Sequence, residues 1–318
     1  MRLLIVIVNY RTSGLTLDCL ASLAPELRDL SDVKVVVTDN LSKDDSVDTI
    51  SRAIADRNWS WATFMPLPEN GGFAYGNNAA IAPALASTDK PEYVLLLNPD
   101  TVVHPGAIHE LLKFMDAHPD AGIAGSRLED PDGTPQCSAF KFHGILSELD
   151  RGIRMGWVAR LLRRWTVPQA IPTSVSRTDW VAGASMIIRR TVFERVGLLD
   201  SKYFMYFEEV DFCLRVARAG FQCWYVPESR VIHLVGAASQ LSGPRHRKRR
   251  PRYWFDARRR FFVKNYGILY AGLADLAFAT GFALWRLRVL VRLKDDCDPP
   301  RMLWDSIRNS VFLRGTRV

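Results

Sequence analysis

The sequence predicts an α/β protein built on a mainly parallel sheet, and two observations support this prediction. Residues 2–8, 33–38 and 93–97 are apolar runs that do not alternate with polar residues. Such runs are typical of strands that are buried on both faces of a parallel sheet. Each run ends in polar residues, and helical spacing of apolar side chains follows, as in repeated βαβ units. The polar strand ends should therefore meet at one edge of the sheet, where ligands of open α/β sheets bind.

The first strand is expected over residues 2–8 and ends at Asn9, Tyr10 and Arg11. The run is too short for the core of a signal peptide, so we interpret it as a strand. Ser13 suits the N-cap of the helix that follows. The apolar face of this helix is predicted to hold Leu20, Leu23, Leu27 and Leu30.

The second strand, residues 33–38, ends at Asp39, and a third extended run over 61–67 leads to the glycine-containing segment 69–78. Glycines allow a ligand to approach the backbone closely, and the N-terminus of the next helix favours an anion. The spacing does not fit G-x-G-x-x-G, which disfavours a dinucleotide-binding fold. A tight turn without a ligand is the alternative interpretation.

The strand over residues 93–97 ends in Asn98, Pro99 and Asp100. A carboxylate on this proline-stiffened turn is well placed to hold a divalent cation against a phosphate. The alternative is that Asp100 only caps a following helix. A helix is expected from Pro105, with an inward face of Ile108, Leu111, Leu112 and Met115, and then a short strand over 122–125.

Residues 137–178 show no clear period, and no elements are predicted there. After this stretch, the sequence predicts a strand over 186–188 and a short helix from Thr191 to Gly197. An aromatic run over 203–207 then leads into Glu208, Glu209 and Asp211, followed by a helix that ends at Gly220 and a strand over 223–226.

A carboxylate beside aromatic side chains and near water suits a general base. The alternative for Asp211 is a surface ion pair with Arg215, four residues later in the helix. His233, after the strand-like residues 230–232, is structural unless the fold pairs it with Asp100.

The chain of 318 residues has the composition of a globular protein, with 48% hydrophobic and 24% charged residues. Five scattered cysteines without a CxxC pair indicate neither a disulfide framework nor a zinc site, which favours a reducing cytoplasm. The net charge of +8 is concentrated, because residues 245–260 hold nine Arg and Lys. We interpret this segment as a flexible loop that closes over a nucleotide, with Arg258, Arg259 or Arg260 near the phosphates. Nucleic-acid binding is the competing interpretation, but no nucleic-acid-binding fold accompanies it.

Residues 268–285 form an apolar run that contains Asp275, two glycines and a threonine. The run is short for a bilayer span. Because a basic flank follows it, we expect a helix that lies on an anionic membrane, packs on the core or forms a dimer contact.

Seven stretches together resemble the family 2 glycosyltransferases of the GT-A fold, and within them the rhamnosyltransferase-like branch. They are IVIVNYRT, VVVTDNLSKDDS, NGGFAYGNN, LLLNPD, WVAGASMIIRR, YFMYFEEVDFCLR and VIH, which run over about three quarters of the chain. The resemblance implies a Rossmann-like mixed, mainly parallel sheet with a helical C-terminal extension, divided into domains at 1–240 and 241–318. It also implies an inverting transferase that uses a nucleotide-diphosphate sugar and a divalent metal, Mg²⁺ or Mn²⁺.

The resemblance assigns roles to individual residues. Asp39 would contact the nucleoside, Asp100 and His233 would hold the metal, and Glu209 would deprotonate the acceptor hydroxyl. Glu208 and Asp211 stay open as alternatives for the base. Acceptor contacts would come from Trp180, Gly183 and Glu208. The nucleotide-sugar site would comprise Val8, Asn9, Tyr10, Asp39, Asn70, Gly72, Phe73, Asn77, Asn78, Asn98 and Asp100.

Three residues depart from the family pattern. Asn98 replaces the first acid of the family's D-x-D turn, although NPD is frequent in the rhamnosyltransferase-like branch. Asn77 stands where many relatives have an arginine, and Glu209 replaces the usual aspartate. The longer Glu209 side chain is the reason why a neighbouring acid stays open as the base.

By resemblance, the donor is dTDP-rhamnose, with a UDP-sugar as the alternative, and the acceptor is a saccharide or a lipid-linked saccharide in cell-surface polysaccharide synthesis. The competing functions are those of a sugar nucleotidyltransferase and of a non-catalytic sugar-nucleotide-binding protein. No nucleic-acid partner is expected. The expected location is the cytoplasm, with peripheral attachment to the inner face of the cell membrane and a homodimer as further expectations.

Overall fold

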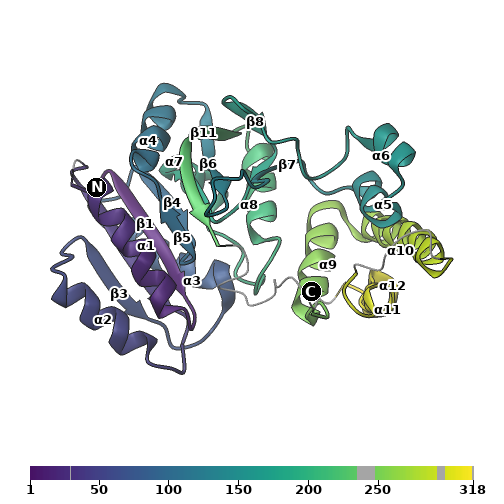
Figure 1. The fold of residues 1–318 in the computed structure, drawn as a ribbon, viewed down its shortest axis with the longest axis horizontal. Coiled ribbons are helices and arrows are strands. Elements are labelled where there is room, and N and C mark those ends of the chain that lie inside the picture. The colour runs from purple at the N-terminus through teal and green to yellow at the C-terminus, as the bar shows by residue number, and fades with distance from the viewer. Residues whose placement is uncertain (29, 235–247, 292–297, 317–318) are drawn as a thin grey trace. The chain divides into compact units, whose positions relative to one another are not determined.

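The structure, a computed structural model, describes residues 1–28, 30–234, 248–291 and 298–316, and the chain forms two compact units (Figure 1). The first unit consists of Met1–Phe140, Ala170–Phe204 and Glu208–Ser239, and the second of Lys141–Gln169, Met205–Phe207 and Gln240–Val318. The boundary at residue 240 stays a prediction. The structure adds that residues 141–169, for which no element was predicted, cluster with the C-terminal segment.

A nine-stranded mixed sheet forms the centre of the first unit, in the order β3-β2-β1-β4-β10-β6-β11-β5, with β8 paired to β11. β1 to β4 are mutually parallel, and β10 runs antiparallel to both of its neighbours. The strands are β1 Leu3–Asn9, β2 Val33–Asp39, β3 Ala62–Pro66, β4 Tyr93–Leu97, β5 Thr101–Val103, β6 Ala121–Glu129, β8 Ser176–Thr178, β10 Ser185–Arg189 and β11 Gln222–His233. A two-stranded sheet pairs β7 Ala139–Phe140 with β9 Trp180–Val181. The predicted fold class is confirmed.

The helices of the first unit follow the predicted strand–helix alternation. They are α1 Ser13–Glu26, α2 Ser46–Asp56, α3 Gly72–Ala86, α4 Ala107–Ala117, α7 Arg190–Val196 and α8 Glu208–Arg218. Ser13 was predicted as the N-cap of α1, but the N-cap is Thr12 and the helix ends before Leu30. The predicted inward face of α4 is confirmed, since all four of its apolar residues are buried.

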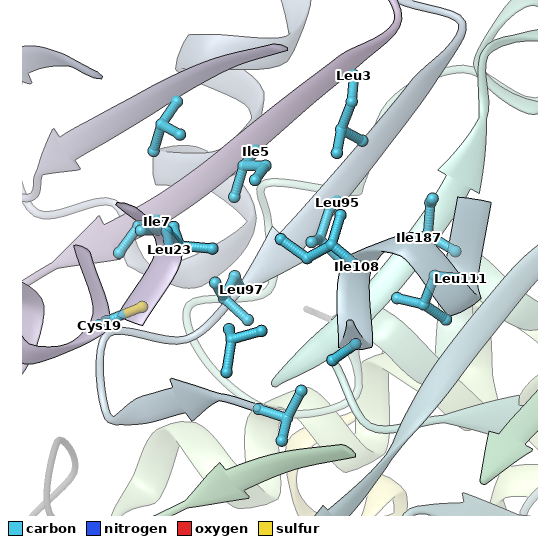
Figure 2. Close-up of a cluster of buried hydrophobic side chains, with 14 of the residues drawn as sticks. Leu3, Ile5, Ile7, Cys19, Leu23, Leu95, Leu97, Ile108, Leu111 and Ile187 are labelled. Carbon is cyan, nitrogen blue, oxygen red and sulfur yellow. The ribbon is translucent and has the colours of Figure 1, made fainter. Parts of the chain in front are cut away.

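The core of the first unit lies around β1 and β4, whose residues are all buried. Figure 2 shows Ile5, Ile7, Leu95 and Leu97 of these strands packed with Leu23 of α1 and with Ile108 and Leu111 of α4. Burying each such side chain contributes about 1.5–3 kcal/mol. Because both faces of β1 and β4 are buried in this core, their sequences are apolar throughout and do not alternate between apolar and polar residues.

The strand register brings polar residues together at one edge of the sheet. β1 and β2 end side by side, with Asn9 opposite Asp39. β4 ends at Leu97 opposite Ser185, and His233 at the end of β11 lies opposite Thr101 of β5. The ends of four strands thus contribute to one region.

The second unit is helical. It contains α5 Ile145–Ile153, α6 Gly156–Leu162, α9 Arg252–Tyr266, α10 Ile268–Leu290, α11 Met302–Arg308 and α12 Val311–Arg314. α10 packs closely along α5, because a Cβ atom on Gly281 would lie 2.9 Å from the backbone oxygen of Leu149. In the described chain, α10 is the one helix that by length and composition could cross a membrane, and 44% of its most apolar window is buried in the protein.

The basic segment 245–260 does not form the expected loop throughout. Arg245 and Arg247 lie outside the described residues, and from Arg252 the chain is helix α9. Arg258 pairs with Glu148 and Asp275 in the interior of the second unit. Arg259 is buried as well and donates to the backbone oxygen of Asn309. The hypothesis that Arg258 or Arg259 contacts nucleotide phosphates is therefore wrong, because groups of this unit already bind both side chains. The same hypothesis for Arg260 stays a prediction.

Candidate functional site

Asn9 and Asp39 form a fully buried pair where β1 and β2 end. The Nδ2 atom of Asn9 donates to Oδ1 of Asp39 at 2.6 Å. Ser42 donates through its hydroxyl and its backbone N–H to the two carboxylate oxygens, at 2.7 and 2.8 Å. Asp39 thus organises the loop after β2. Of the two residues that flank Asn9, Val8 is 9% exposed and Tyr10 is 40% exposed.

The glycine-containing segment, residues 69–78, contacts the segment that precedes the acidic motif, which is the cluster of acids at 208–211. Gly72 has φ +86°, and a Cβ atom there would lie 1.7 Å from the backbone oxygen of Phe204. Phe73 N–H donates to that same oxygen at 3.0 Å. The side-chain oxygen of Asn70 accepts from Gly72 N–H at 3.2 Å. The first two N–H groups of α3, those of Gly72 and Phe73, are therefore used within the protein rather than offered to an anion.

Asn77 and Asn78 make hydrogen bonds within the protein. Asn77 is 1% exposed and donates to the backbone oxygen of Phe73, one turn earlier in α3. Asn78 bonds to both backbone groups of Leu199, at 2.7 and 3.2 Å. Asn78 therefore fixes the segment that follows α7.

Asp100 and His233, which are far apart in the sequence, come together at the sheet edge. Nε2 of His233 lies 3.6 Å from Oδ1 of Asp100, which is 3% exposed. Leu234 N–H also donates to the backbone oxygen of Asp100, at 2.9 Å. The turn itself is held by Asn98, whose N–H donates to the backbone oxygen of Ala184.

The Asp100–His233 pair can be tested as a metal site. No group of three or more potential metal-ligating side chains occurs among the described residues. The pair supplies one carboxylate and one imidazole, and Mg²⁺ is commonly bound by one or two carboxylates together with substrate phosphates and water. His233 Nδ1 has no hydrogen-bond partner within the described residues. The pair therefore fits a cation that takes most of its ligands from a bound diphosphate.

Glu208 and Glu209 begin α8, where Glu208 is buried and Glu209 is partly buried. Burial raises the pKa of both carboxyl groups, and the charge of Glu209 raises that of Glu208 further. One carboxylate oxygen of each has no hydrogen-bond partner in the described chain. A Cβ atom on Gly183 would lie 3.4 Å from the Phe73 ring and 3.8 Å from Cβ of Glu209. The acidic motif, the glycine-containing segment and the loop before β10 thus meet at one place.

Asp211 differs from the two glutamates, because both of its oxygens are bound. Tyr203 donates its hydroxyl to Oδ1 at 3.2 Å, and Arg215 donates Nε to Oδ2 at 3.0 Å. Arg215 also donates to the backbone oxygens of Val196 and Leu198. The ion pair considered as the alternative role of Asp211 does form, but it is not the surface pair that was expected, because Asp211 is fully buried.

The ring of Trp180 stacks on that of Phe140, with centroids 4.1 Å apart, and Trp180 is 8% exposed. Its observed contacts are therefore structural.

Two residues that shape the site were not predicted, namely Ser42 and Phe204. Ser42 follows Asp39 by three residues, so the turn after β2 brings its hydroxyl and backbone N–H to the aspartate side chain. Phe204 acts through its backbone oxygen, which leaves no signal in the sequence.

Comparisons with known proteins agree with this arrangement. The family model described as "Glycosyltransferase like family 2" matches residues 2–260. An N-acetylglucosaminyl-diphospho-decaprenol L-rhamnosyltransferase of Mycobacterium tuberculosis is 30% identical over 212 residues, which are 63% of this chain and 66% of that protein. The rhamnosyltransferase WbbL of Escherichia coli is 28% identical over 51% of this chain and 60% of its own. The chain thus spans just under two thirds of the length of these relatives.

Two solved structures share the fold at low sequence identity. The mannosyltransferase PcManGT of Pyrobaculum calidifontis, in complex with GDP-Man and Mn²⁺, matches with a TM-score of 0.57 and 15% identity over the whole of this chain and 88% of its own. TarS of S. aureus with UDP-GlcNAc matches with a TM-score of 0.54 and 17% identity over 98% and 82%. The fold is of the GT-A type, and the chain belongs to glycosyltransferase family 2.

Proposed function

We propose that this glycosyltransferase moves rhamnose from a dTDP-sugar to a hydroxyl of a saccharide or lipid-linked saccharide, with inversion at the anomeric carbon. The observation that carries the proposal is the approach of His233 to the buried Asp100, at 3.6 Å, beside the polar ends of the central strands. The names of the mycobacterial and E. coli relatives support the choice of sugar.

On the donor side, Asp100 and His233 would hold Mg²⁺ or Mn²⁺ against the diphosphate. The cation, when bound, supplies positive charge that stabilises the departing nucleotide diphosphate. The Asn9–Asp39 pair would shape the nucleoside pocket, and the exposed Tyr10 would lie against the base or ribose. Asn77 and Asn78 would act indirectly, because their amides bind the protein.

On the acceptor side, Glu209 would act as the base and Glu208 as the alternative. The carboxylate takes the proton from the acceptor hydroxyl, the hydroxyl oxygen bonds to the anomeric carbon, and the bond to the donor phosphate breaks. One displacement of this kind inverts the configuration and requires one base. The raised pKa of Glu209 makes it a stronger proton acceptor than an ordinary glutamate. Gly183 would leave room for the acceptor beside Glu209.

Asp211 is the weakest of the three candidates for the base. Its carboxylate is held by Tyr203 and Arg215 and is fully buried, so proton transfer would first require these contacts to break. We therefore assign it a supporting role at the start of α8. We place the reaction in the cytoplasm at the inner face of the membrane, since the mycobacterial relative is named for a polyprenol-linked acceptor.

The test is transfer of labelled rhamnose from dTDP-rhamnose to an N-acetylglucosaminyl-diphospho-polyprenol, with and without Mn²⁺. We expect product only with the cation, and none from the Asp100→Asn variant. Donor choice is tested in parallel with UDP-sugars and by thermal shift with dTDP, UDP, GDP and CMP. A ligand at ~100-fold over its dissociation constant stabilises the protein by about 2.7 kcal/mol. Stabilisation by UDP alone would reject the dTDP donor, and unchanged turnover of the Asp100→Asn variant would reject the role of Asp100.

A further inference from the structure

Helix α10 of the second unit has one face packed against α5 and one apolar face exposed to solvent. Six exposed apolar positions of α10 and its C-cap follow one another at intervals of three, four or eight residues, which places these six on a single side of the helix. They are Leu269 (84% exposed), Leu273 (54%), Leu276 (56%), Leu284 (44%), Leu287 (58%) and Val291 (64%). We call this set the apolar stripe. An exposed apolar surface of this extent usually marks an interaction site.

Helix α12 extends the apolar stripe sideways. The ring of Phe312 lies 3.1 Å from the position that a Cβ atom of Gly272 would occupy, beside the start of the stripe. Phe312 is nevertheless 67% exposed, and Leu313 next to it is 65% exposed. On α11, Trp304 is 60% exposed. Tryptophan is enriched where proteins meet the headgroup region of a membrane.

The acids of these helices are withdrawn from the surface. Residues 268–291 and 298–316 contain three acids, and each is engaged inside the unit. Asp275 pairs with Arg258 and accepts from Val311 N–H. Asp298 pairs with Arg154, and Asp305 pairs with Arg249.

Five arginines lie in the same two segments, and none of them is fully buried. They are Arg286, Arg288, Arg301, Arg308 and Arg314. The described surface of α10 to α12 therefore combines leucines with positive charge and exposes no carboxylate. This combination matches an anionic lipid surface, to which basic residues are attracted while apolar side chains enter the headgroup boundary.

We propose that α10 lies in the plane of an anionic membrane and inserts the apolar stripe, with α11 and α12 beside it. A bilayer-spanning orientation does not fit, because the opposite face of α10 is packed on α5 and contains the buried Asp275–Arg258 pair. A second copy of the same face fits poorly, because five arginines would oppose five arginines. The inference rests on the proposed function for its purpose, which is to hold the enzyme where lipid-linked acceptors lie.

The test is co-flotation of the full-length protein with vesicles of phosphatidylglycerol and phosphatidylcholine, or of phosphatidylcholine alone, in the absence of donor and acceptor. We expect binding to the anionic vesicles that weakens with salt. Leu273→Glu and Leu287→Glu should each weaken binding more than about tenfold, because each variant loses the burial of one leucine side chain. Arg308→Gln with Arg314→Gln should weaken it about 25-fold, since each basic residue near the surface contributes about fivefold.

Matched controls come from exposed positions of the first unit. Ile171→Glu and Lys90→Gln make the same kinds of change and should bind vesicles as the unchanged protein does. Binding by Leu273→Glu equal to that of the unchanged protein, or no binding of the unchanged protein to anionic vesicles, would overturn the proposal. It would also be overturned if the stripe variants converted a dimer to a monomer in sedimentation without changing flotation. Because no sugar is present, flotation can fail or succeed independently of the transfer reaction.

Discussion

Replacement of Gly72 by alanine should damage the site through a contact between two backbone segments. Gly72 has φ +86°, a conformation that an L-residue adopts at about 1–2 kcal/mol. The new Cβ atom would also lie 1.7 Å from the backbone oxygen of Phe204, which accepts from Phe73 N–H. The segments must separate, and the loss of this hydrogen bond adds about 1 kcal/mol. We expect a total destabilisation of at least about 2–3 kcal/mol.

Gly106→Ala is the matched control for this substitution. Gly106 has φ +84° at the start of α4, but nothing lies within 4 Å of its added Cβ atom. This variant isolates the cost of the backbone conformation, so its free energy of unfolding should fall by only about 1–2 kcal/mol. Denaturant unfolding of both variants measures the difference, which we attribute to the overlap with Phe204.

Activity separates the two variants further. Phe204 lies four residues before Glu208 in the chain, so its displacement should move the acidic motif as well as the glycine-containing segment. A shift of about 1 Å can lower kcat about 100-fold. We expect such a loss for Gly72→Ala and near-normal kcat for Gly106→Ala, both assayed well below their melting temperatures. Equal stability and equal kcat for the two variants would refute the assigned contact.

The remaining predictions concern the acids at the start of α8. Glu209→Gln should leave dTDP binding in thermal-shift assays unchanged but lower kcat by about 10²- to 10⁴-fold, whereas a comparable loss only in Glu208→Gln would transfer the role of base to Glu208. Because burial raises the pKa of Glu209, kcat should fall on acidification at a pH above the ordinary glutamate value of about 4.5, and a flat pH profile down to that value would count against an ionised glutamate as base. The pKa of Glu208 is raised in the folded state, so its carboxyl group lowers stability increasingly as pH rises from about 4.5 through the raised pKa. Glu208→Gln should therefore stabilise the protein at pH 8 more than at pH 4, and a pH-independent effect in thermal unfolding would contradict this assignment. Asp211→Ala leaves the partly buried Arg215 without its ion-pair partner and should destabilise the protein by about 3–5 kcal/mol in denaturant unfolding. A loss of less than about 1 kcal/mol, as for a surface ion pair, would contradict this expectation.

Much of the first unit could be predicted because its strands are buried on both faces. The runs that became β1 and β4 have no charged or amide side chain between residues 3 and 8 or between 93 and 97, and their ends therefore located Asn9 and Asp100 at the sheet edge. The approach of His233 to Asp100 could not be read from local sequence. It depends on the pairing of β11 with β5, which joins segments that are far apart in the chain.

Helix α5 was not predicted, and its packing explains why. The face that it buries includes Ser147, Glu148 and Gly152, which are polar or small. Glu148 is stable there because Arg151 and Arg258 surround it. A pattern based on hydrophobic spacing cannot detect such a face.

The side-chain amides of Asn77 and Asn78 pose the same difficulty, because nothing in the sequence separates an amide that binds a ligand from one that binds the backbone.

The central claim is that Asp100 and His233 hold a divalent cation against the donor diphosphate. Anomalous scattering from crystals of the full-length protein grown with dTDP and Mn²⁺ tests this claim most directly. We expect a manganese peak within ligand distance of the Asp100 carboxylate and of a ring nitrogen of His233, with the diphosphate also bound to it. A nucleotide bound in the crystal with its diphosphate and manganese away from both side chains would contradict the account.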